Sequence, residues 1–450
     1  MLRAAGTGAG GRLFRLLIGA LILVSAAAQF ALVPVMPVYA RRFGLSGFEE
    51  GMVLGATGLA TLVVSVPAGT LSDRFGPRRI TLAAGLLMAA ATAAQALAGG
   101  FPALLAARLV FGAGYGMVWT AGLCWLAGAA AGGPPALGGS VASAGVGGVA
   151  GPAASGALAQ HLGLAVPLLV TAAGLAVITA GLAVLRVPPG PAVPRAARAA
   201  TLPGLRAVAA NRNLVGAAAA VVAAGLSTGV CTLLVPARLH AAGASPGQIG
   251  LAFAASGVLF AIGSALTAAA GRRAVSLPVT CGGLFVLAGA LSLAVVGTTP
   301  LPLVVMLCVT TAARSVLWTV SYPLAASAGQ PGSGEPGSGE PGSGEPGSGQ
   351  PGSGEPGPSG LGATVGLLNV IWAATAVLGP LAAGLAAEHL GSGVAFGLTQ
   401  VACAAALAVA ATVTWRGRNP SARIRRPGQV GHRFPAEVEH RLRLPGRAQP

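Results

Sequence analysis

Long uncharged stretches of apolar residues restrict the folds that this chain can adopt. The first runs without a charge from Leu16 to Ala40, and a helix of about 20 apolar residues is long enough to cross a bilayer. In lipid the backbone must satisfy its own hydrogen bonds, so such stretches form helices. We place 12 transmembrane helices near residues 14–39, 49–71, 80–98, 102–128, 138–161, 164–185, 213–239, 248–270, 275–297, 301–328, 361–388 and 394–415. The pattern predicts an all-α polytopic membrane protein.

The composition excludes an ordinary soluble domain. Of the 450 residues, 54% are hydrophobic and only 8% are charged, which is too little charge to cover a soluble surface. The five cysteines all lie inside apolar runs, without a C-x-x-C pair or a neighbouring histidine, and are interpreted as small core residues. We therefore expect no disulfide, no metal site and no cofactor. Clustered histidines or acids that would indicate a membrane enzyme are also missing from the sequence.

The positions of the arginines predict the orientation in the membrane. All 27 basic residues are arginine, and the net charge is +17. With the N-terminus inside, 22 arginines fall in cytoplasmic segments, the side that arginine favours. We expect a multi-pass protein of the cell (plasma or inner) membrane with both termini in the cytoplasm. Arginine clusters beside spans indicate contacts with anionic lipid headgroups at the inner face, and no nucleic acid is expected as a partner.

The start of the chain allows two interpretations. Three arginines precede the first apolar run, and the alanines at 26–28 resemble a signal-peptide cleavage site. The run continues to Tyr39, however, and is long enough to span the bilayer. We favour an uncleaved first helix, with a bend near its end at Pro34 and Pro37.

One polar turn stands out between two apolar runs. It reads G-T-L-S-D-R-F-G-P-R-R and extends from Gly69 to Arg79. Asp73 is the only carboxylate between Glu50 and Glu335, so it does not belong to a charged surface. Its isolation indicates a specific role.

The other residues of the turn fit a tight cytoplasmic connection. Gly69 and Gly76 permit a close approach of two helices and a reversing chain, and Pro77 stops the first helix. Three arginines then lie at the membrane surface: Arg74, Arg78 and Arg79.

This turn resembles the loop between helices 2 and 3 of the Major Facilitator Superfamily, a large class of secondary transporters. Arg108 and Gly112 on the fourth predicted helix are similar to that superfamily's R-x-x-x-G-x-G pattern, with Phe111 where glutamine is common. Residues of the fifth helix are similar to a pattern of exporters that act as antiporters, with Ser155 in place of one glycine: Gly147, Gly151, Pro152 and Gly156.

The resemblance implies a fold and a mechanism. Two pseudo-symmetric bundles of six helices would rock about a central site and expose it to each side in turn. Asp73 would approach the start of helix 11 near Leu361, where the helix dipole stabilises a carboxylate in one of the two states. The most similar branch, that of 12-helix drug or metabolite exporters, implies a monomer that is driven by the proton gradient and carries a small-molecule substrate.

The sequence also contains an internal parallel repeat. Five residues recur 199 positions later, namely Pro37, Gly44, Ser46, Gly51 and Gly58 as Pro236, Gly243, Ser245, Gly250 and Gly257. A second pair of similar stretches, 151–163 and 379–391, is offset by 228. The offset grows by 29, which is the length of the P-G-S-G-E stretch at 330–358.

These patterns predict the domain organisation. A first six-helix bundle occupies residues 1–185, an arginine-rich cytoplasmic loop 186–212, and a second six-helix bundle 213–415. The insert at 330–358, between helices 10 and 11, is predicted to be a flexible solvated spacer. The basic tail at 416–450 is predicted to be disordered and drawn to the inner leaflet.

Polar and aromatic residues inside spans are candidates for the substrate pathway. Helix 4 carries Arg108, Tyr115 and Trp119, and helix 10 carries Arg314, Trp318 and Tyr322. Helix 1 carries Gln29, and helix 11 carries Asn369 and Trp372. A charge inside a span is costly, so a functional role is the first interpretation. For Arg108 the alternative is a brace satisfied by backbone carbonyls, and for Arg314 the two interpretations are balanced. The aromatic residues have a simpler interpretation as packing or interface anchors.

The absence of an acid in the middle of any predicted span leaves the function open. Glu49, Glu50 and Glu388 lie at outer ends, as do His161 and His389, so a coupling proton has no evident carrier. Two buried arginines without a buried acid suit an anionic or neutral solute. An uptake carrier or facilitator for such a metabolite is therefore the second hypothesis beside the proton-coupled exporter. A third is a non-transporting sensor or scaffold that uses the basic tail for a partner.

Overall fold

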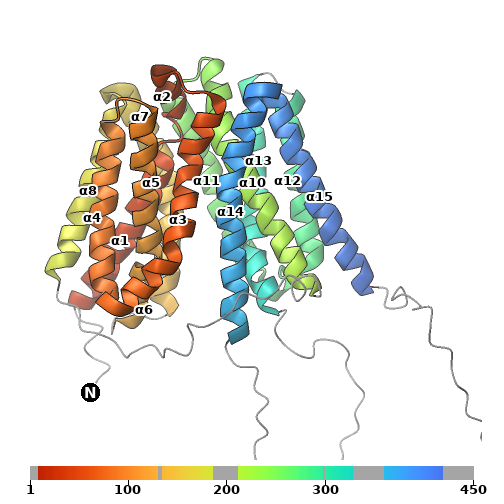
Figure 1. Ribbon diagram of the computed structural model, residues 1–450. Helices are drawn as coiled ribbons and strands as arrows, with labels where there is room; N and C mark the ends of the chain where they lie inside the picture. Colours follow the sequence, from red (N-terminus) through yellow and green to blue (C-terminus); the bar gives the residue numbers. More distant parts are fainter. Residues whose placement is uncertain (1–8, 130–133, 186–210, 297–298, 328–358, 419–450) are drawn as a thin grey trace, which may run out of the picture.

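The computed structural model describes residues 9–129, 134–185, 211–296, 299–327 and 359–418, which form helices joined by short turns (Figure 1). No strand occurs in these ranges. The predicted central loop up to residue 210, the insert at 330–358 and the tail from residue 419 lie outside them.

Helices, most of them long, run through the described residues in both parts of the chain. In the first part they are α1 (Ala9–Ala31), α2 (Met36–Phe43), α3 (Gly47–Phe75), α4 (Pro77–Ala96), α5 (Phe101–Met117), α6 (Leu123–Gly128), α7 (Pro134–Leu162) and α8 (Ala165–Val184). In the second part they are α10 (Arg212–Ala241), α11 (Pro246–Ala269), α12 (Leu277–Val296), α13 (Pro300–Ala326), α14 (Ser359–Leu390) and α15 (Ser392–Arg418).

The helices pack in two groups. In the first group α1 lies against α7 and α8, and α5 lies against α3 and α4. In the second group α10 lies against α13, α14 and α15, and α12 lies against α13 and α15. The groups meet chiefly where α3 packs on α14 and where α7 packs on α11. We name these two contacts the α3–α14 seam and the α7–α11 seam.

The bundle has two ends, which we name by what they carry. The motif end carries the turn at Gly76 between α3 and α4, and the distal end carries α2. In Figure 1 the distal end is at the top, where α3 and α14 lie close together, and their lower ends diverge. The α3–α14 seam is therefore a contact of the distal half of the bundle.

Eleven described helical stretches are long and apolar enough to cross a membrane. The remaining predicted span, at 138–161, is present as the 29-residue α7, which is rich in glycine and serine and is not among the eleven. Small residues are typical of helices that pack closely in lipid. The prediction of an all-α polytopic membrane fold is confirmed.

The first predicted span is broken in two, which corrects the expectation of one bent helix. α1 ends at Ala31, and α2 begins at Met36. Pro34 has no N–H with which to continue the helix. Pro37 stands in the first turn of α2, where a missing N–H leaves no bond unmade.

The predicted span at 102–128 is also interrupted. α5 passes into a π-helical turn at Val118–Gly122 before α6 begins. Such a turn inserts an extra residue into the helical register and is frequent at functional sites. Trp119 lies in this turn, so its spacing from Arg108 is not that of a regular α-helix.

The predicted repeat has structural counterparts at the starts of α3 and α11. Ser46 and Ser245 each cap their helix through a capping box. Just before them, Gly44 and Gly243 have φ values of 64° and 88°, a left-handed conformation that favours glycine. Positions 199 residues apart therefore start two helices in the same way.

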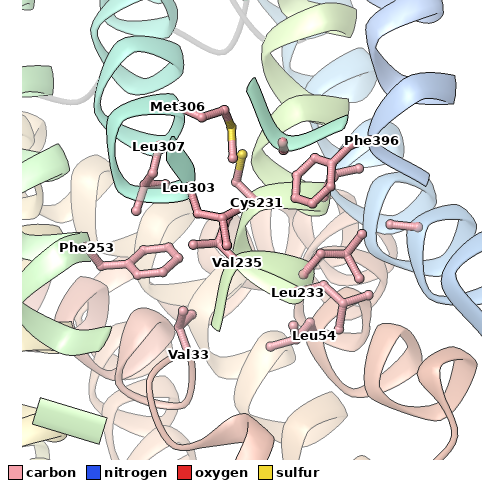
Figure 2. Close-up of a cluster of buried hydrophobic side chains, with 14 of the residues drawn as sticks. Val33, Leu54, Cys231, Leu233, Val235, Phe253, Leu303, Met306, Leu307 and Phe396 are labelled. Carbon is pink, nitrogen blue, oxygen red and sulfur yellow. The ribbon is translucent and has the colours of Figure 1, made fainter. Parts of the chain in front are cut away.

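A continuous apolar cluster joins the two groups of helices. Figure 2 shows Val33 and Leu54, from the first group, near Leu233 and Phe253 of the second. Cys231 belongs to the same cluster and is fully buried. Apolar packing thus accompanies both seams.

Candidate functional site

The turn at the motif end contains the residues predicted to control gating. α3 ends at Phe75, and Gly76 has a φ of 87°, which only glycine adopts readily. Asp73 is exposed on the last turn of α3. A side chain at Gly69 would meet no atom within 4 Å, so the close approach expected there does not occur in this structure.

Two arginines of this turn, Arg78 and Arg74, contact neighbouring residues. Arg78 Nη2 donates to the carbonyl oxygens of Ala183 (2.6 Å) and Leu185 (3.3 Å) at the C-terminal end of α8. A cation is favourable at this end of a helix. Arg74 lies over the ring of Phe75, 5.2 Å from its centroid, and Arg79 is exposed. The predicted approach of Asp73 to Leu361 stays a prediction.

Arg108 is buried where α1, α4 and α5 meet. Its side chain is 1% exposed. Nη2 donates to the carbonyl oxygen (2.8 Å) and to Oε1 (3.2 Å) of Gln29, and Nη1 donates to Oε1 of Gln95 (3.5 Å). The guanidinium also lies 5.1 Å from the ring centroid of Phe111. Arg108 therefore joins three helices through hydrogen bonds.

The break after α1 explains why Arg108 has a backbone partner. The last four carbonyl groups of a helix have no partner within it. Val33 donates to Phe30, so the Gln29 carbonyl is left for Arg108, and the Ala31 carbonyl accepts from Ser155 Oγ at 2.5 Å. Side chains of α5 and α7 thus complete the end of α1 inside the bundle.

Arg314 lies between α10 and α13 and has only neutral partners. Nη1 donates to Thr228 Oγ1 (2.6 Å), and Nη2 donates to Thr311 Oγ1 (2.7 Å). Its Nε, like that of Arg108, is buried without a hydrogen-bond partner among the described residues. The guanidinium can therefore accept an anionic partner without breaking a bond to a protein carboxylate.

An aromatic cluster continues from Arg314 along α13 toward the motif end. The Trp318 ring centroid is 5.3 Å from that of Tyr322 and 4.7 Å from that of Trp372 on α14. Tyr322 donates its hydroxyl to Asn369 Oδ1 at 2.9 Å. On α5 and the following π turn, Tyr115 stacks on Phe111 and lies 6.0 Å from Trp119.

The predicted glycine pattern of α7 lies between α1 and α11. A Cβ atom on Gly151 would lie 2.5 Å from the Ala27 carbonyl oxygen, and one on Gly147 would collide with the Leu23 carbonyl oxygen. On the other face of α7, a Cβ on Gly156 would collide with the carbonyl oxygen of Pro246 on α11. The glycines thus allow backbone contact on two sides.

The two seams repeat the same contacts. In the α7–α11 seam, Gly250 faces the carbonyl oxygen of Pro152. In the α3–α14 seam, Gly51 faces the carbonyl oxygen of Pro380. A second pair of contacts is also repeated. In the α3–α14 seam Gly384 faces the carbonyl of Gly47, and in the α7–α11 seam Gly156 faces the carbonyl of Pro246. Neither seam admits a larger side chain at these glycines.

Gly112, from the predicted pattern of helix 4, makes a further backbone contact. A Cβ there would lie 2.7 Å from the Cα of Thr57 on α3. Thr61 of α3 donates to the Gly112 carbonyl oxygen at 3.1 Å. This glycine therefore holds α5 close to α3.

Apart from Arg314, which contacts Thr228 and Thr311, the predicted pathway residues form two separate clusters. Gln29 and Arg108 contact each other, as do the three aromatic residues and Asn369 of the second cluster. Among the described residues, no hydrogen bond or ring contact joins the two clusters.

The sequence did not identify several partners that the structure shows. Gln95, Thr228 and Thr311 bind the arginines, but isolated hydroxyl and amide residues in apolar helices carry no positional signal. Ser155 was noted only as a departure from a glycine pattern. The glycines of the seams were visible as repeat positions, although the repeat did not say what they contact.

These features define a class of protein. Helices long enough to span a membrane, two groups built from a parallel repeat and buried arginines beside polar partners are typical of secondary transporters. A sequence profile of the Major Facilitator Superfamily matches residues 18–334, which is more than half of the chain. The chain belongs to this superfamily and is a transporter rather than an enzyme.

Curated relatives match over short segments. The arabinose-proton symporter of Bacillus subtilis (strain 168) is 37% identical over 101 residues, 22% of this chain and 21% of the symporter. The quinolone resistance protein NorA of Staphylococcus aureus is 31% identical over 86 residues, 19% of this chain and 22% of NorA. The chain thus spans about a fifth of the length of these relatives.

Solved structures match over almost the whole fold. A bacterial homolog of the human lysosomal transporter Spinster, in an inward-facing and unoccupied conformation, has a TM-score of 0.71 at 16% identity. The match covers 91% of this chain and 98% of that chain. The same homolog in an inward-facing and occupied conformation has a TM-score of 0.70 at 15% identity. At this identity the likeness concerns the fold alone.

Proposed function

We propose that this chain exports a small drug-like compound or metabolite in exchange for protons, by alternating access. The observation that carries the proposal is the glycine–proline pattern of α7. Gly151 contacts α1, and Gly156 contacts α11, so the residues that resemble an antiporter pattern lie at the joint between the two groups of helices. A joint of this kind is where one group would rock against the other.

The proposed orientation places the motif end in the cytoplasm. The arginine bias supports it, since Arg74, Arg78 and Arg79 lie at that end together with the chain's N-terminal side. The membrane is then the cell membrane, with anionic headgroups near these arginines. The α3–α14 and α7–α11 seams would close the outer side, and the diverging helix ends would face the cytoplasm.

The relatives support proton coupling and export to different degrees. NorA is named for quinolone resistance, which agrees with export of a drug-like compound, and the arabinose-proton symporter is named for coupling to protons. We extend neither substrate to this chain. What the proposal takes from them is a proton-driven cycle.

The export proposal is tested in inside-out vesicles that contain the purified chain and an imposed pH gradient. A panel of cationic dyes, neutral drugs and organic anions is added, and the pH gradient is followed. We expect one class of compound to dissipate the gradient only when active protein is present. If no compound does so while counterflow of a solute occurs, the protein is a facilitator instead of an antiporter.

Asp73→Asn tests the proposed role of the turn at the motif end. We expect the loss of charge to shift the balance between the outward-open and inward-open forms, because a carboxylate interacts with a helix start in only one of them. Accessibility of single cysteines on each side reports that balance. Unchanged accessibility in Asp73→Asn would refute the role.

A second candidate function rests on Arg314. A half-buried guanidinium with only hydroxyl partners suits an anionic metabolite, and an uptake carrier or facilitator for such a solute needs no acid in the middle of a span. The charge of the compound that is transported in the vesicle assay decides between this candidate and the export of a cationic drug.

A further inference from the structure

A cavity of about 320 Å³ lies at the distal end of the α3–α14 seam. It is partly open and is lined by residues of both helix groups: Gly47, Glu50, Leu233, Leu234, Ala237, Arg238, Ala241, Ala387, Glu388 and Ser392. Most of these residues are apolar. The cavity therefore exists only while α3, α10 and α14 are packed together.

Glu50 enters this cavity from the first turns of α3 without a polar partner. Its neighbour Glu49 belongs to the capping box and accepts from the backbone N–H of Ser46 at 2.8 Å. The Glu50 carboxylate accepts no hydrogen bond from the described residues. Glu50 is half-buried, so its charged carboxylate loses part of its hydration without a hydrogen bond in return, whereas its neutral form is accommodated at lower cost.

The charged groups around Glu50 act in opposite directions. Glu388 shares the cavity and accepts from the Phe48 N–H at 3.1 Å, and a second carboxylate disfavours ionisation of the first. Arg238 favours ionisation, but its guanidinium donates to Ser392 Oγ at 2.8 Å and to the Ala294 carbonyl oxygen. The other titratable or charged residues at the distal ends of α2, α3, α10 and α14 are Tyr39, Arg41, Arg42, Glu49, His240 and His389.

The α7–α11 seam has no acid at the equivalent positions. Glu50 corresponds to Ile249, which is 0% exposed, and Arg238 corresponds to Tyr39, which is 1% exposed, both at the 199-residue offset. At the 228-residue offset, Glu388 corresponds to Gln160, which accepts from Ser245 Oγ at 2.9 Å. One seam is neutral and filled, while the other holds two carboxylates around a cavity.

We infer that Glu50 is a proton-binding latch of the α3–α14 seam. Proton binding to Glu50 stabilises the closed seam, and ionisation stabilises the open seam, in which the carboxylate is more fully hydrated. Because the open state holds fewer protons than the closed state, acid on the distal side favours closure, and alkali favours opening. The latch biases the conformational equilibrium and is separate from any proton that crosses the membrane.

The inference rests on the alternating-access part of the proposed function and not on the direction of transport. It is tested without substrate or gradient. Spin labels are placed at Leu162 and Leu390, which are exposed at the distal ends of α7 and α14, after replacement of the native cysteines. The distance between the labels is measured in lipid between about pH 5 and about pH 8, the range in which a carboxylate in an apolar site titrates.

The expected result is a short distance at low pH that lengthens as the pH rises. Glu50→Gln should keep the short distance at every pH. Glu388→Gln should move the transition to lower pH by about one unit, because the like charge is gone, and Arg238→Gln should move it to higher pH by a similar amount. Glu49→Gln is the matched control, since Gln248 serves the same capping box in the repeat, and it should leave the transition unchanged.

A distance that does not depend on pH in the unsubstituted chain would overturn the latch, as would a Glu50→Gln variant that keeps the original transition. If Glu50→Gln does not fold, Glu50→Ile is measured in its place, because it introduces the residue found at the equivalent position, Ile249. A pH-dependent distance in a protein that moves no compound in vesicles would leave the latch standing and refute the export proposal.

Discussion

The two groups of helices each hold an arginine at an equivalent junction but give it different partners; Arg108 is buried, and Arg314 is half-buried. Gln29 and Thr228 lie 199 residues apart, at the same position of the repeat, and they bind Arg108 and Arg314 respectively. Arg108 reaches a backbone carbonyl because α1 ends at Ala31. α10 runs without a break to Ala241, so Arg314 finds only hydroxyl groups.

The comparison teaches that burial alone does not distinguish a structural arginine from a binding one. The difference lies in whether a helix that ends nearby leaves backbone carbonyl groups without a partner, because a cation is favourable beside such carbonyl groups. Arg108 has such acceptors and braces the first group. Arg314 lacks them and keeps its capacity for an anionic solute.

The largest expected effect is that of Arg108→Ala on stability. The change leaves the Gln29 carbonyl and the Gln95 side chain without their hydrogen-bond donor. Each buried group left unpaired lowers the free energy of unfolding by about 1–3 kcal/mol. Thermal unfolding in detergent measures the loss. Arg314→Ala is the matched comparison and should lower the melting temperature much less, because Thr228 keeps its bond to the Ala224 carbonyl. Equal losses would contradict the assigned difference.

The next effect concerns the two seams. Gly51→Val and Gly250→Val each place a side chain against a proline carbonyl of the facing helix, so we expect either to prevent closure. Transport in vesicles should fall by at least about tenfold, which corresponds to about 1.4 kcal/mol. Gly145→Val on α7 is the control, because a Cβ there meets nothing within 4 Å. Normal transport by Gly51→Val would show that the α3–α14 seam does not need to close.

An effect of similar size, but limited to one class of ligand, is expected for Arg314→Gln. A hydrogen bond to a charged group contributes about 1.5–3 kcal/mol, so binding of an organic anion should weaken roughly tenfold or more. Binding of a neutral compound should change little, and so should the melting temperature. Titration calorimetry with paired anionic and neutral probes makes the measurement. An equal loss for both probes would assign Arg314 to packing.

The smallest expected effect is that of Ser155→Ala. It removes the hydroxyl that binds the Ala31 carbonyl and should cost about 1–3 kcal/mol, the effect of one buried acceptor left unpaired. Ser155→Gly, which restores the glycine of the exporter pattern, should cost about the same. Ser143→Ala on the same helix is the control, since that hydroxyl binds its own helix at Gly139. Melting temperatures in detergent compare the three.

The sequence was sufficient for the fold because lipid imposes a simple rule on apolar stretches. Length and charge alone located the helices, and the 199-residue offset related Gly51 to Gly250 before their contacts were known. The sequence failed where a helix is interrupted. Pro34 and Pro37 indicated a bend, but whether a proline bends or ends a helix depends on partners elsewhere in the chain.

The candidate site was less accessible to prediction. That Arg108 and Arg314 lie inside spans could be predicted from the sequence, but several of their partners come from helices distant in the chain, such as Thr228 for Arg314. Glu50 was placed correctly in sequence at the end of a span, yet its cavity is formed by Leu234 and Ala387, which lie far along the chain. Such contacts have no local signature in a uniformly apolar sequence.

The completion of α1 by later helices has a consequence for biosynthesis. The carbonyls of Gln29 and Ala31 find their partners in Arg108 and Ser155, which are synthesised long after α1 has left the ribosome. Until then the first span enters the membrane with acceptors that lipid cannot satisfy. The end of α1 can take its final form only once α7 has been inserted, although α1 is made well before α7.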